Sequence, residues 1–529
     1  MRPALAAAAL TAALAAVLHV PAPAQEARLP DIGSSAATVI SPSEQAEYGA
    51  MMLSQLRYYG YTLEDPLLLS WLRAMGQRLA ASSDDPKQPF TFFLLRDRQI
   101  NAFATLGGYI GVNAGLVLAA DHEDGVAAVL SHEIAHVTQA HVLRAVEQAQ
   151  RDRVPIMLAM LGAIALAQGA GGNSADDATM AALASAQGLM VQRMIDYTRS
   201  NEAEADRIGI RTLSRAGYDV DAMAGFFQTL QASVRSNISG SREGTPDYLQ
   251  THPVTTSRIS EARERARQIA SAPQGFVPTA SQRDNLLLPS SLRIGAALPA
   301  RGATGMFPWA RERLRVLSAD TPAAAVREYE RLARSGELDD AQRYGQAVAH
   351  YLDGKPATAA TALAALLERH PGDTWLELAL AQSLARAGRT EEADARFEAL
   401  VARMPHSRPV ALTYAEMLNE RNTRAAGNRA QALLRPLLAG AGDDPVFQQT
   451  YARASEIAGD PVRAGEAYAE AAFLNGRPEQ ALLQLNTLKR RDDLDYYARA
   501  RIDARIAAIT PVVLELHRQG IRDEDINRR

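Results

Sequence analysis

A repeated spacing in the C-terminal half limits the folds open to this chain more than any other sequence feature. Gly354 and Gly388 lie 34 residues apart, and so do Pro371 and Pro405, which end the stretches LLERHP and LVARMP. An alanine follows each of these glycines by five residues. A helical unit repeated at this interval cannot bury its apolar face alone, so adjacent copies must stack into a solenoid.

The glycine–alanine pair recurs further along the chain with less regular spacing. Gly427 and Gly459 extend the series at intervals of 39 and 32 residues, and Gly476 repeats it after only 17 more. The 34-residue period resembles that of the tetratricopeptide repeat, in which small residues stand where paired helices approach closely. We therefore expect a solenoid of such repeats over residues 309–520, with an unrelated helical bundle as the alternative.

The composition agrees with a mainly helical chain of several domains. At 529 residues the chain is too long for one core, and aromatic residues make up only 6% of it. With 56 basic and 60 acidic residues the net charge is −4, and no long basic block stands out, so nucleic acid is not an expected partner. The chain contains no cysteine, which excludes disulfides and thiolate metal ligands.

The N-terminus has the pattern of a secretory signal. Residues 1–24 combine one arginine, an apolar run from Ala4 to Leu18, and a small-residue cleavage site that ends at Ala24. This predicts export to the periplasm, an oxidising compartment that suits a chain without thiols. The alternative is a permanent anchor, although the run is shorter than the ~20 residues that a membrane span needs. Residues 25–43, rich in Pro, Ser and Ala, are expected to be flexible.

Residues 44–272 are interpreted as one α+β domain ahead of the repeats. Apolar residues have helical spacing from Glu44 to Ala81, Phe90–Arg96 and Ile100–Leu106 are typical of strands, and GGYIGVNAGLVLAA adds a short strand and a helix. Residues 273–308 are rich in Pro, Gly and Ser, which predicts a linker. The expected fold is therefore mainly α: an α+β domain with a small sheet, followed by an α-solenoid of tetratricopeptide-like repeats.

The next predicted helix contains the stretch VLSHEIAHVTQAH. Asp121 is expected to cap this helix, which should run to about Gln150. Its first two histidines are four residues apart and therefore share one face. His141 follows after five residues rather than four, so we interpret it, like His122, as structural.

The pattern H-E-x-x-H in this stretch predicts one half of a zinc site. His132 and His136 can direct their imidazoles at one ion, and zinc accepts neutral nitrogen ligands while keeping one position open for water. Glu133, next to a ligand, is placed to take the proton from a water molecule that attacks a carbonyl. One Zn²⁺ per chain is the expected cofactor, although sites of this type also accept cobalt or manganese.

The stretch SNEAEADRIGI offers the missing third ligand. Glu202 and Asp206 lie four residues apart on one helical face, so Glu202 can complete a two-histidine, one-glutamate site. Asp206 is then expected to orient a ligand histidine through its second ring nitrogen. The alternative is a solvated charged face, and for Glu204 that is our interpretation.

Taken together, HEIAH, NEAEAD and THPVTTSR make the chain similar to the minigluzincin metalloproteases, the family that includes the CAAX prenyl proteases. Within it, the chain resembles periplasmic members that carry C-terminal tetratricopeptide repeats. The resemblance implies that Arg258 stabilises the oxyanion of the reaction and that His252 is a regulatory fourth ligand that excludes water. It also implies that Asn101, Ala102, Phe103 and Ala104 form an edge strand that binds substrate in extended form.

The apolar segment Val154–Gly172 has three interpretations. It is too short to span a bilayer. It can be a buried hairpin helix, a lid over the cleft between the ligand-bearing helices, or a peripheral contact with the membrane.

The resemblance implies a zinc-dependent endopeptidase of periplasmic protein quality control. Its partners would be misfolded or stalled outer-membrane β-barrel proteins and the β-barrel assembly machinery, recruited by the repeats, with chaperone activity in addition. The alternative function is a non-proteolytic chaperone or scaffold, in which His252 permanently closes a structural zinc site.

Overall fold

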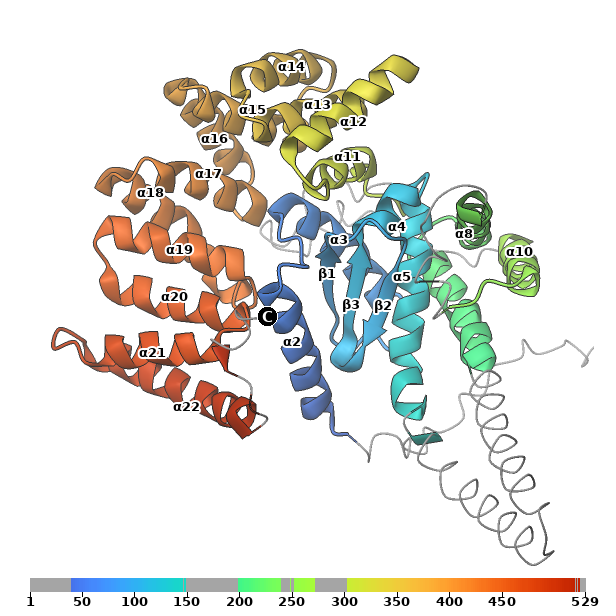
Figure 1. Ribbon diagram of the computed structural model, residues 1–529, viewed down its shortest axis with the longest axis horizontal. Helices are drawn as coiled ribbons and strands as arrows, with labels where there is room; N and C mark the ends of the chain where they lie inside the picture. Colours follow the sequence, from blue (N-terminus) through green and yellow to red (C-terminus); the bar gives the residue numbers. More distant parts are fainter. Residues whose placement is uncertain are drawn as a thin grey trace, which may run out of the picture.

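A computed structural model describes residues 40–145, 147–148, 198–238, 248, 252–271, 302–518, 520 and 522–523. The predicted signal segment and the apolar segment Val154–Gly172 lie outside these residues. The described part confirms a mainly helical fold, with one small sheet ahead of a helical repeat array (Figure 1). Within it, no helix combines the length and the apolar character that crossing a membrane requires.

The sheet has three strands in the order β1-β3-β2. Strand β1 (Thr91–Leu95) pairs in parallel with β3 (Tyr109–Asn113), and β2 (Ala102–Thr105) pairs antiparallel with the other side of β3. All three lie within the stretches predicted as strands. Strand β2 is therefore an edge of the sheet, as the resemblance implied.

Helices cover the sheet on both sides. The helical stretch predicted from Glu44 to Ala81 forms two helices, α2 (Pro42–Tyr58) and α3 (Pro66–Ala81). Each has a proline at its first position and an oxygen-bearing side chain at its N-cap, where the backbone would otherwise lack hydrogen-bond partners. Helices α4 (Ala114–Ala119) and α5 (Glu123–Thr138) follow β3, and α5 packs against β2 and α3 (Figure 1).

Helix α5 differs from its prediction at both ends. Its N-cap is His122 rather than Asp121, and the helix ends at Thr138 instead of continuing to about Gln150. The physical reason for the early end is Ala140, which has φ +53°, a left-handed conformation that an α-helix cannot contain. Residues 141–145 are helical again, so His141 begins a new helical turn. Its direction therefore does not follow from the spacing of a continuous helix.

Three further helices among the described residues belong to this N-terminal domain. Residues 198–215 are helical and contain the stretch with Glu202. Helices α8 (Asp221–Ile238) and α10 (Thr256–Ser271) follow and pack against each other. Gly209 allows the helix 198–215 to approach α5 closely, because a Cβ there would lie 3.1 Å from the backbone nitrogen of His132.

The solenoid is built from antiparallel helix pairs. Its helices are α11 (Phe307–Leu317), α12 (Pro322–Ser335), α13 (Asp340–Leu352), α14 (Pro356–Arg369), α15 (Thr374–Arg386), α16 (Thr390–Arg403), α17 (Arg408–Glu420), α18 (Arg424–Leu434), α19 (Pro445–Ala458), α20 (Pro461–Leu474), α21 (Pro478–Lys489) and α22 (Tyr496–Arg518). The first helices of successive pairs, α13, α15, α17, α19 and α21, begin 34, 34, 37 and 33 residues apart. These intervals confirm the predicted repeat array.

The register of the third repeat differs from the prediction. The turns after α13, α15 and α19 contain Gly354, Gly388 and Gly459 with positive φ, but after α17 this conformation belongs to Asn422, with φ +51°. Gly427 instead lies inside α18, where a Cβ would be 2.7 Å from a backbone nitrogen of α19. It therefore occupies the small-residue position of the repeat, which alanine fills in the other pairs.

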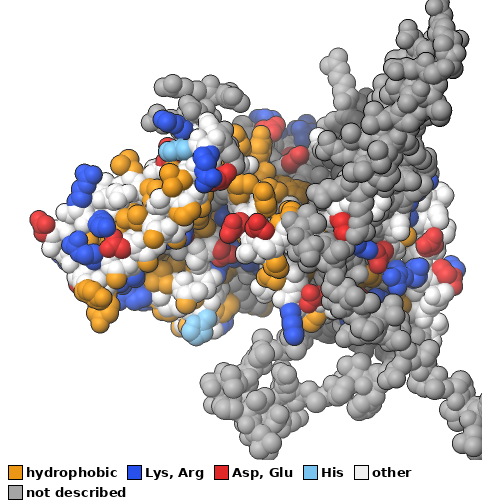
Figure 2. Space-filling model, turned by 90° about the horizontal axis from the view of Figure 1, so that it is seen from below, with side chains coloured by type: hydrophobic (Ala, Val, Ile, Leu, Met, Phe, Trp, Pro, Cys, Tyr) orange, Lys and Arg blue, Asp and Glu red, His pale blue; other side chains and the backbone are white. Residues whose placement is uncertain are grey.

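The solenoid curves around the N-terminal domain and contacts it through α11 near its start, through α17 midway and through α20 further along (Figure 1). Near its start, Arg313 forms a buried ion pair with Asp65 (2.6 Å), and the Glu123 carboxylate accepts hydrogen bonds from the backbone and side chain of Thr304. Thr304 lies in the predicted linker, whose last residues thus pack on the N-terminal domain. On the coloured part of the face in Figure 2, acidic and basic side chains are interspersed.

Candidate metal centre

Three segments that are far apart in the sequence converge on one buried point. Helix α5 supplies His132 and His136, the helix 198–215 supplies Glu202, and the turn before α10 supplies His252. One potential ligand atom from each of the four lies within 4.8 Å of the others. All four residues are buried except His136, which is partly buried.

Glu202 lies at the centre of this cluster. Its carboxylate oxygens are 3.4 Å from Nε2 of His132, 3.3 Å from Nε2 of His136 and 2.9 Å from Nδ1 of His252. The Nε2 atoms of His132 and His136 are 3.0 Å apart. The structure thus brings together the three predicted ligands and the predicted fourth.

This donor set fits a zinc ion. The Nδ1 atoms of His132 and His136 face Asp206 and His141, so both Nε2 atoms can point unprotonated lone pairs at the centre. Two such lone pairs 3.0 Å apart repel each other unless a proton or a metal cation lies between them. Nitrogen and carboxylate oxygen are ligands that Zn²⁺ accepts in catalytic sites.

Burial and neighbouring charges shift the pKa values of the candidate ligands. Burial opposes protonation of His132, but Glu202 and Asp206 outweigh it and raise the pKa of this imidazole to about 10. Burial lowers the pKa of His136 to about 3. Although burial alone would raise the pKa of Glu202, His132 and the other histidines hold it far below its ordinary value. Glu202 is therefore ionised, as a ligand must be.

Glu133 lies between the metal cluster and the edge strand. Its side chain is 1% exposed, and burial raises the pKa of its carboxyl group, against the effect of a hydrogen bond from the backbone N–H of Ala104 in β2. Oε1 of Glu133 is 3.7 Å from Nε2 of His252. A carboxylate with a raised pKa beside a metal cluster is suited to accept a proton from water.

Asp206 links a ligand histidine to Arg258. Its Oδ1 lies 2.9 Å from Nδ1 of His132, and it accepts two hydrogen bonds from Arg258, of 2.7 and 2.8 Å. Nη1 of Arg258 donates to the Pro253 carbonyl and lies 2.8 Å from Oε2 of Glu202. These contacts engage the guanidinium with the carboxylates that surround the ligands.

A second chain of contacts leads outward from His136, and the sequence interpretation missed it. Nδ1 of His141 lies 2.8 Å from Nδ1 of His136, and Nε2 of His141 lies 3.2 Å from Oε2 of Glu204. Arg144 donates a 2.8 Å hydrogen bond to the same Glu204 oxygen. We interpreted His141 as structural, and it does hold a ligand histidine, whereas the interpretation of Glu204 as a solvated charge was wrong, because Glu204 pairs with His141 and Arg144. The helix break at Ala140 brings His141 back to the centre, and no sequence spacing signals it.

Aromatic rings support two of these residues. The ring of Tyr248, which is fully buried, stacks on His252 with a centroid distance of 4.7 Å. The Arg258 guanidinium lies 4.8 Å from the ring centre of Phe227 on α8. Both contacts come from segments outside the motifs, so the motifs alone did not identify them.

The fold and the site together define a metalloendopeptidase joined to a solenoid. Peptidase family M48 matches residues 66–266, and a tetratricopeptide repeat matches residues 350–417. The beta-barrel assembly-enhancing protease of Yersinia pestis is 33% identical over 92% of both chains, and that of Escherichia coli strain K12 is 32% identical over 90% of both. A putative beta-barrel assembly-enhancing protease of Vibrio cholerae is 42% identical over 45% of this chain and 48% of its own length.

The chain belongs to peptidase family M48, in the group of the beta-barrel assembly-enhancing proteases. A mitochondrial metalloendopeptidase of Schizosaccharomyces pombe is also similar, with 26% identity over 41% of this chain. These matches confirm the predicted family and the combination of a metallopeptidase domain with repeats.

Proposed function

We propose that this chain is a zinc-dependent endopeptidase of periplasmic protein quality control, which degrades misfolded or stalled outer-membrane β-barrel proteins. The observation that carries the proposal is the convergence of His132, His136 and Glu202 beside a buried Glu133 and the edge strand β2. The names of the relatives in Yersinia pestis and Escherichia coli support the substrate class.

The proposed chemistry divides between the ion and the protein. When bound, zinc supplies a Lewis acid that polarises the scissile carbonyl and lowers the pKa of water. Glu133 accepts the proton of the attacking water and afterwards delivers it to the leaving amine. Asp206 keeps the imidazole of His132 in the orientation that leaves Nε2 free.

Strand β2 is the proposed binding edge for substrate. The side chain of Ala102 is fully buried, whereas Asn101, Phe103 and Ala104 are half-buried. Main-chain groups rather than side chains would therefore make the contacts, which suits an enzyme that cuts varied misfolded chains. The oxyanion role for Arg258 stays a prediction, and the contacts of its guanidinium support a positioning role as well.

The repeats are the proposed recruiting module. Their concave face lies against the protease domain, so a chain held there would be close to the catalytic domain (Figure 1). We propose that this face recruits substrate or the β-barrel assembly machinery, and that the protein carries one zinc ion. For the segment Val154–Gly172, the buried, lid and membrane-contact interpretations stay open.

A non-proteolytic chaperone or scaffold is the second candidate function. One observation favours it: Nδ1 of His252 lies 2.9 Å from Glu202 and 3.4 Å from Nε2 of His132. With His252 included, the cluster has four protein donors, the number typical of a closed structural zinc site. In a protease, His252 must leave this position before water can enter.

We expect the substitution His252→Ala to increase cleavage of an unfolded outer-membrane β-barrel protein severalfold while zinc is retained. The reason is that it removes the group competing with water and keeps the three other donors. Peptide release and zinc content of the purified variant measure this result, with His406→Ala, an exposed histidine of the solenoid, as the matched control. If His252→Ala loses zinc without gaining activity, His252 is a structural ligand and the scaffold function is favoured.

A further inference from the structure

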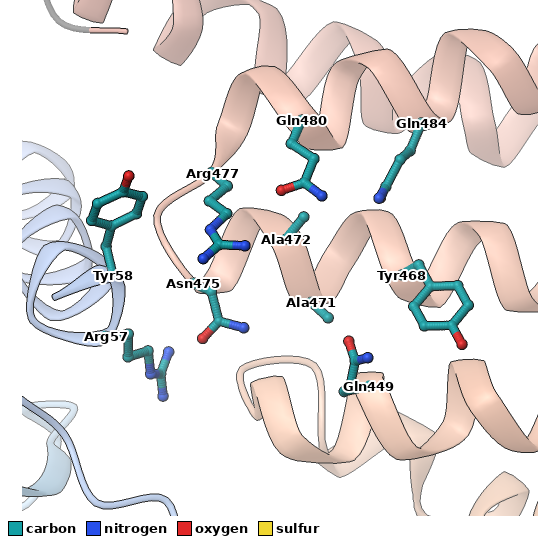
Figure 3. A pocket seen from close by; sticks show the side chains of 10 residues that line it. All are labelled: Arg57, Tyr58, Gln449, Tyr468, Ala471, Ala472, Asn475, Arg477, Gln480 and Gln484. Atoms are coloured by element: carbon teal, nitrogen blue, oxygen red, sulfur yellow. The ribbon is translucent and has the colours of Figure 1, made fainter. Parts of the chain in front are cut away.

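Three cavities follow one another along the concave face of the solenoid. One of about 420 Å³ lies between α2 and helices α19–α21 (Figure 3). The next, of about 370 Å³, shares Gln449 with it, and a third, of about 200 Å³, shares Tyr351 and Gln382 with the second and reaches Asp65 of the protease domain. Neighbouring cavities share lining residues, and the row of three is called the concave groove below.

Side-chain amides from four successive repeats line the concave groove. Gln382 lies on α15, Asn419 on α17, Gln449 on α19, and Gln480 and Gln484 on α21. In Figure 3, Gln480 and Gln484 point from α21 towards Gln449, which points back from α19. These helices are the first members of successive repeats, and each of them contributes at least one amide to the groove.

These amides have unused hydrogen-bonding capacity. In the part of the chain that the structure describes, the side chains of Gln382, Gln449 and Gln484 form no hydrogen bond with protein groups, and Oε1 of Gln484 is buried. Asn419 donates to the Thr450 carbonyl at 3.0 Å, while its buried Oδ1 has no partner there. An amide has a donor and an acceptor that match those of a peptide bond.

The α2 end of the groove is held firmly. Gly476, with φ +72°, lets the turn between α20 and α21 approach α2 so closely that a Cβ there would lie 2.6 Å from the Ser54 carbonyl oxygen. The Arg477 guanidinium lies 5.6 Å from the ring centre of Tyr58 on α2. The groove therefore has a fixed width at this end, which preorganises it for a ligand.

We propose that the concave groove binds an extended polypeptide segment through its main chain, using the row of amides from Gln382 to Gln484. An unfolded segment has unpaired peptide groups along its whole length, and a row of amides can bond them without selecting a side-chain sequence. The inference rests on the proposed function, since it assigns the recruitment of unfolded substrate to particular residues.

The test measures peptide binding to the full chain. The probe is a fluorescein-labelled synthetic peptide of Ser, Thr, Gly and Val, and every protein also carries Glu133→Gln to keep the probe intact. Each of Gln382→Leu, Gln449→Leu and Gln484→Leu is expected to weaken binding about threefold to tenfold, the equivalent of one lost hydrogen bond. Their combination is expected to weaken it further, and Gln228→Leu, an exposed glutamine of α8, to leave it unchanged.

Leucine is chosen because it changes the binding affinity in opposite directions for the two explanations. It removes a hydrogen bond to the peptide main chain, but it adds apolar surface for a ligand held by apolar contact. A groove that binds through apolar contact would bind the probe more tightly after these substitutions, and unchanged or tighter binding therefore overturns the inference. Failure of the proposed function is a separate result: the chain without Glu133→Gln would bind the probe and an unfolded β-barrel protein but cleave neither.

A second inference has an independent origin in the contacts of His136. The geometry points to His141 and Glu204 as positioning residues that fix the tautomer of this ligand. The Glu204 carboxylate can only accept, so Nε2 of His141 donates to it and Nδ1 of His141 is left as an acceptor. Nδ1 of His136 must then donate across the 2.8 Å contact, which leaves Nε2 of His136 free for the metal.

The test is the affinity for Zn²⁺, measured by competition with a chelator, together with the melting temperature of the metal-free protein. His141→Phe keeps an aromatic ring and removes the acceptor Nδ1. We expect a loss of Zn²⁺ affinity of about tenfold, the lower end of the range for residues that support a metal ligand. His141→Asn restores an acceptor and is expected to recover part of it, while His122→Phe, at an exposed histidine, serves as the control. A lower melting temperature with unchanged Zn²⁺ affinity would overturn the positioning role.

Discussion

Replacing Glu133 by glutamine is expected to abolish proteolysis while the protein keeps its zinc. Glutamine has nearly the same shape and leaves His132, His136 and Glu202 in place, but it cannot accept a proton from water. A positioned general base contributes about 10²- to 10⁴-fold, so the rate of cleavage should fall by at least that factor. Peptide release from an unfolded outer-membrane β-barrel protein and zinc content by atomic absorption measure the two halves of this prediction.

The chain provides a closely matched control on the same helix. Glu123 is also a buried carboxylate of α5, but its oxygens accept hydrogen bonds from Thr304 at the contact with the solenoid, away from the metal cluster. Glu123→Gln retains an acceptor there and is expected to leave cleavage unchanged. Full activity of Glu133→Gln would show that the site is not hydrolytic, and loss of zinc from it would show that Glu133 supports the ligands.

The repeat architecture could be predicted because its signal is periodic, but the register of one repeat could not. The turn after α17 needs a left-handed residue, and asparagine adopts this conformation more readily than most residues, so Asn422 replaces the glycine of the other turns. A search for glycine then selected Gly427, which is required by close helix packing. Glycine meets two different physical needs in this solenoid, a left-handed turn and a close contact between helices. Only the three-dimensional contacts show which need a given glycine meets.

The same distinction applies to the metal centre. His132 and His136 could be predicted because the spacing of one helix puts them together, and Glu202 because it lies four residues from Asp206 on one face of a second helix. His252 was implied by the resemblance to the family. His141 and Glu204 have no such signal, since their contact depends on the chain reversal at Ala140 and on two helices that meet in space. Local spacing thus predicted the ligands, and tertiary structure determines which residues support them.

Removing the Asp206 carboxylate is expected to destabilise both the fold and the metal site. Asp206 accepts two hydrogen bonds from Arg258, whose guanidinium is only 9% exposed. In Asp206→Ala this cation loses its main partner in a buried place, so the free energy of unfolding of the metal-free protein should fall by about 3–5 kcal/mol. His132 loses the group that orients it, so Zn²⁺ affinity should fall about 10- to 100-fold.

A second substitution separates these two effects. Adding Arg258→Met to Asp206→Ala removes the unpaired cation, so the double variant should regain part of the lost unfolding free energy. It should not regain Zn²⁺ affinity, because His132 still lacks the carboxylate that lies 2.9 Å from its Nδ1. Denaturant unfolding and chelator competition measure the two quantities, with Asp492→Ala, an exposed carboxylate of the solenoid, as the control. If the double variant recovers affinity together with stability, Asp206 acts only by neutralising Arg258, and its role in orienting His132 is contradicted.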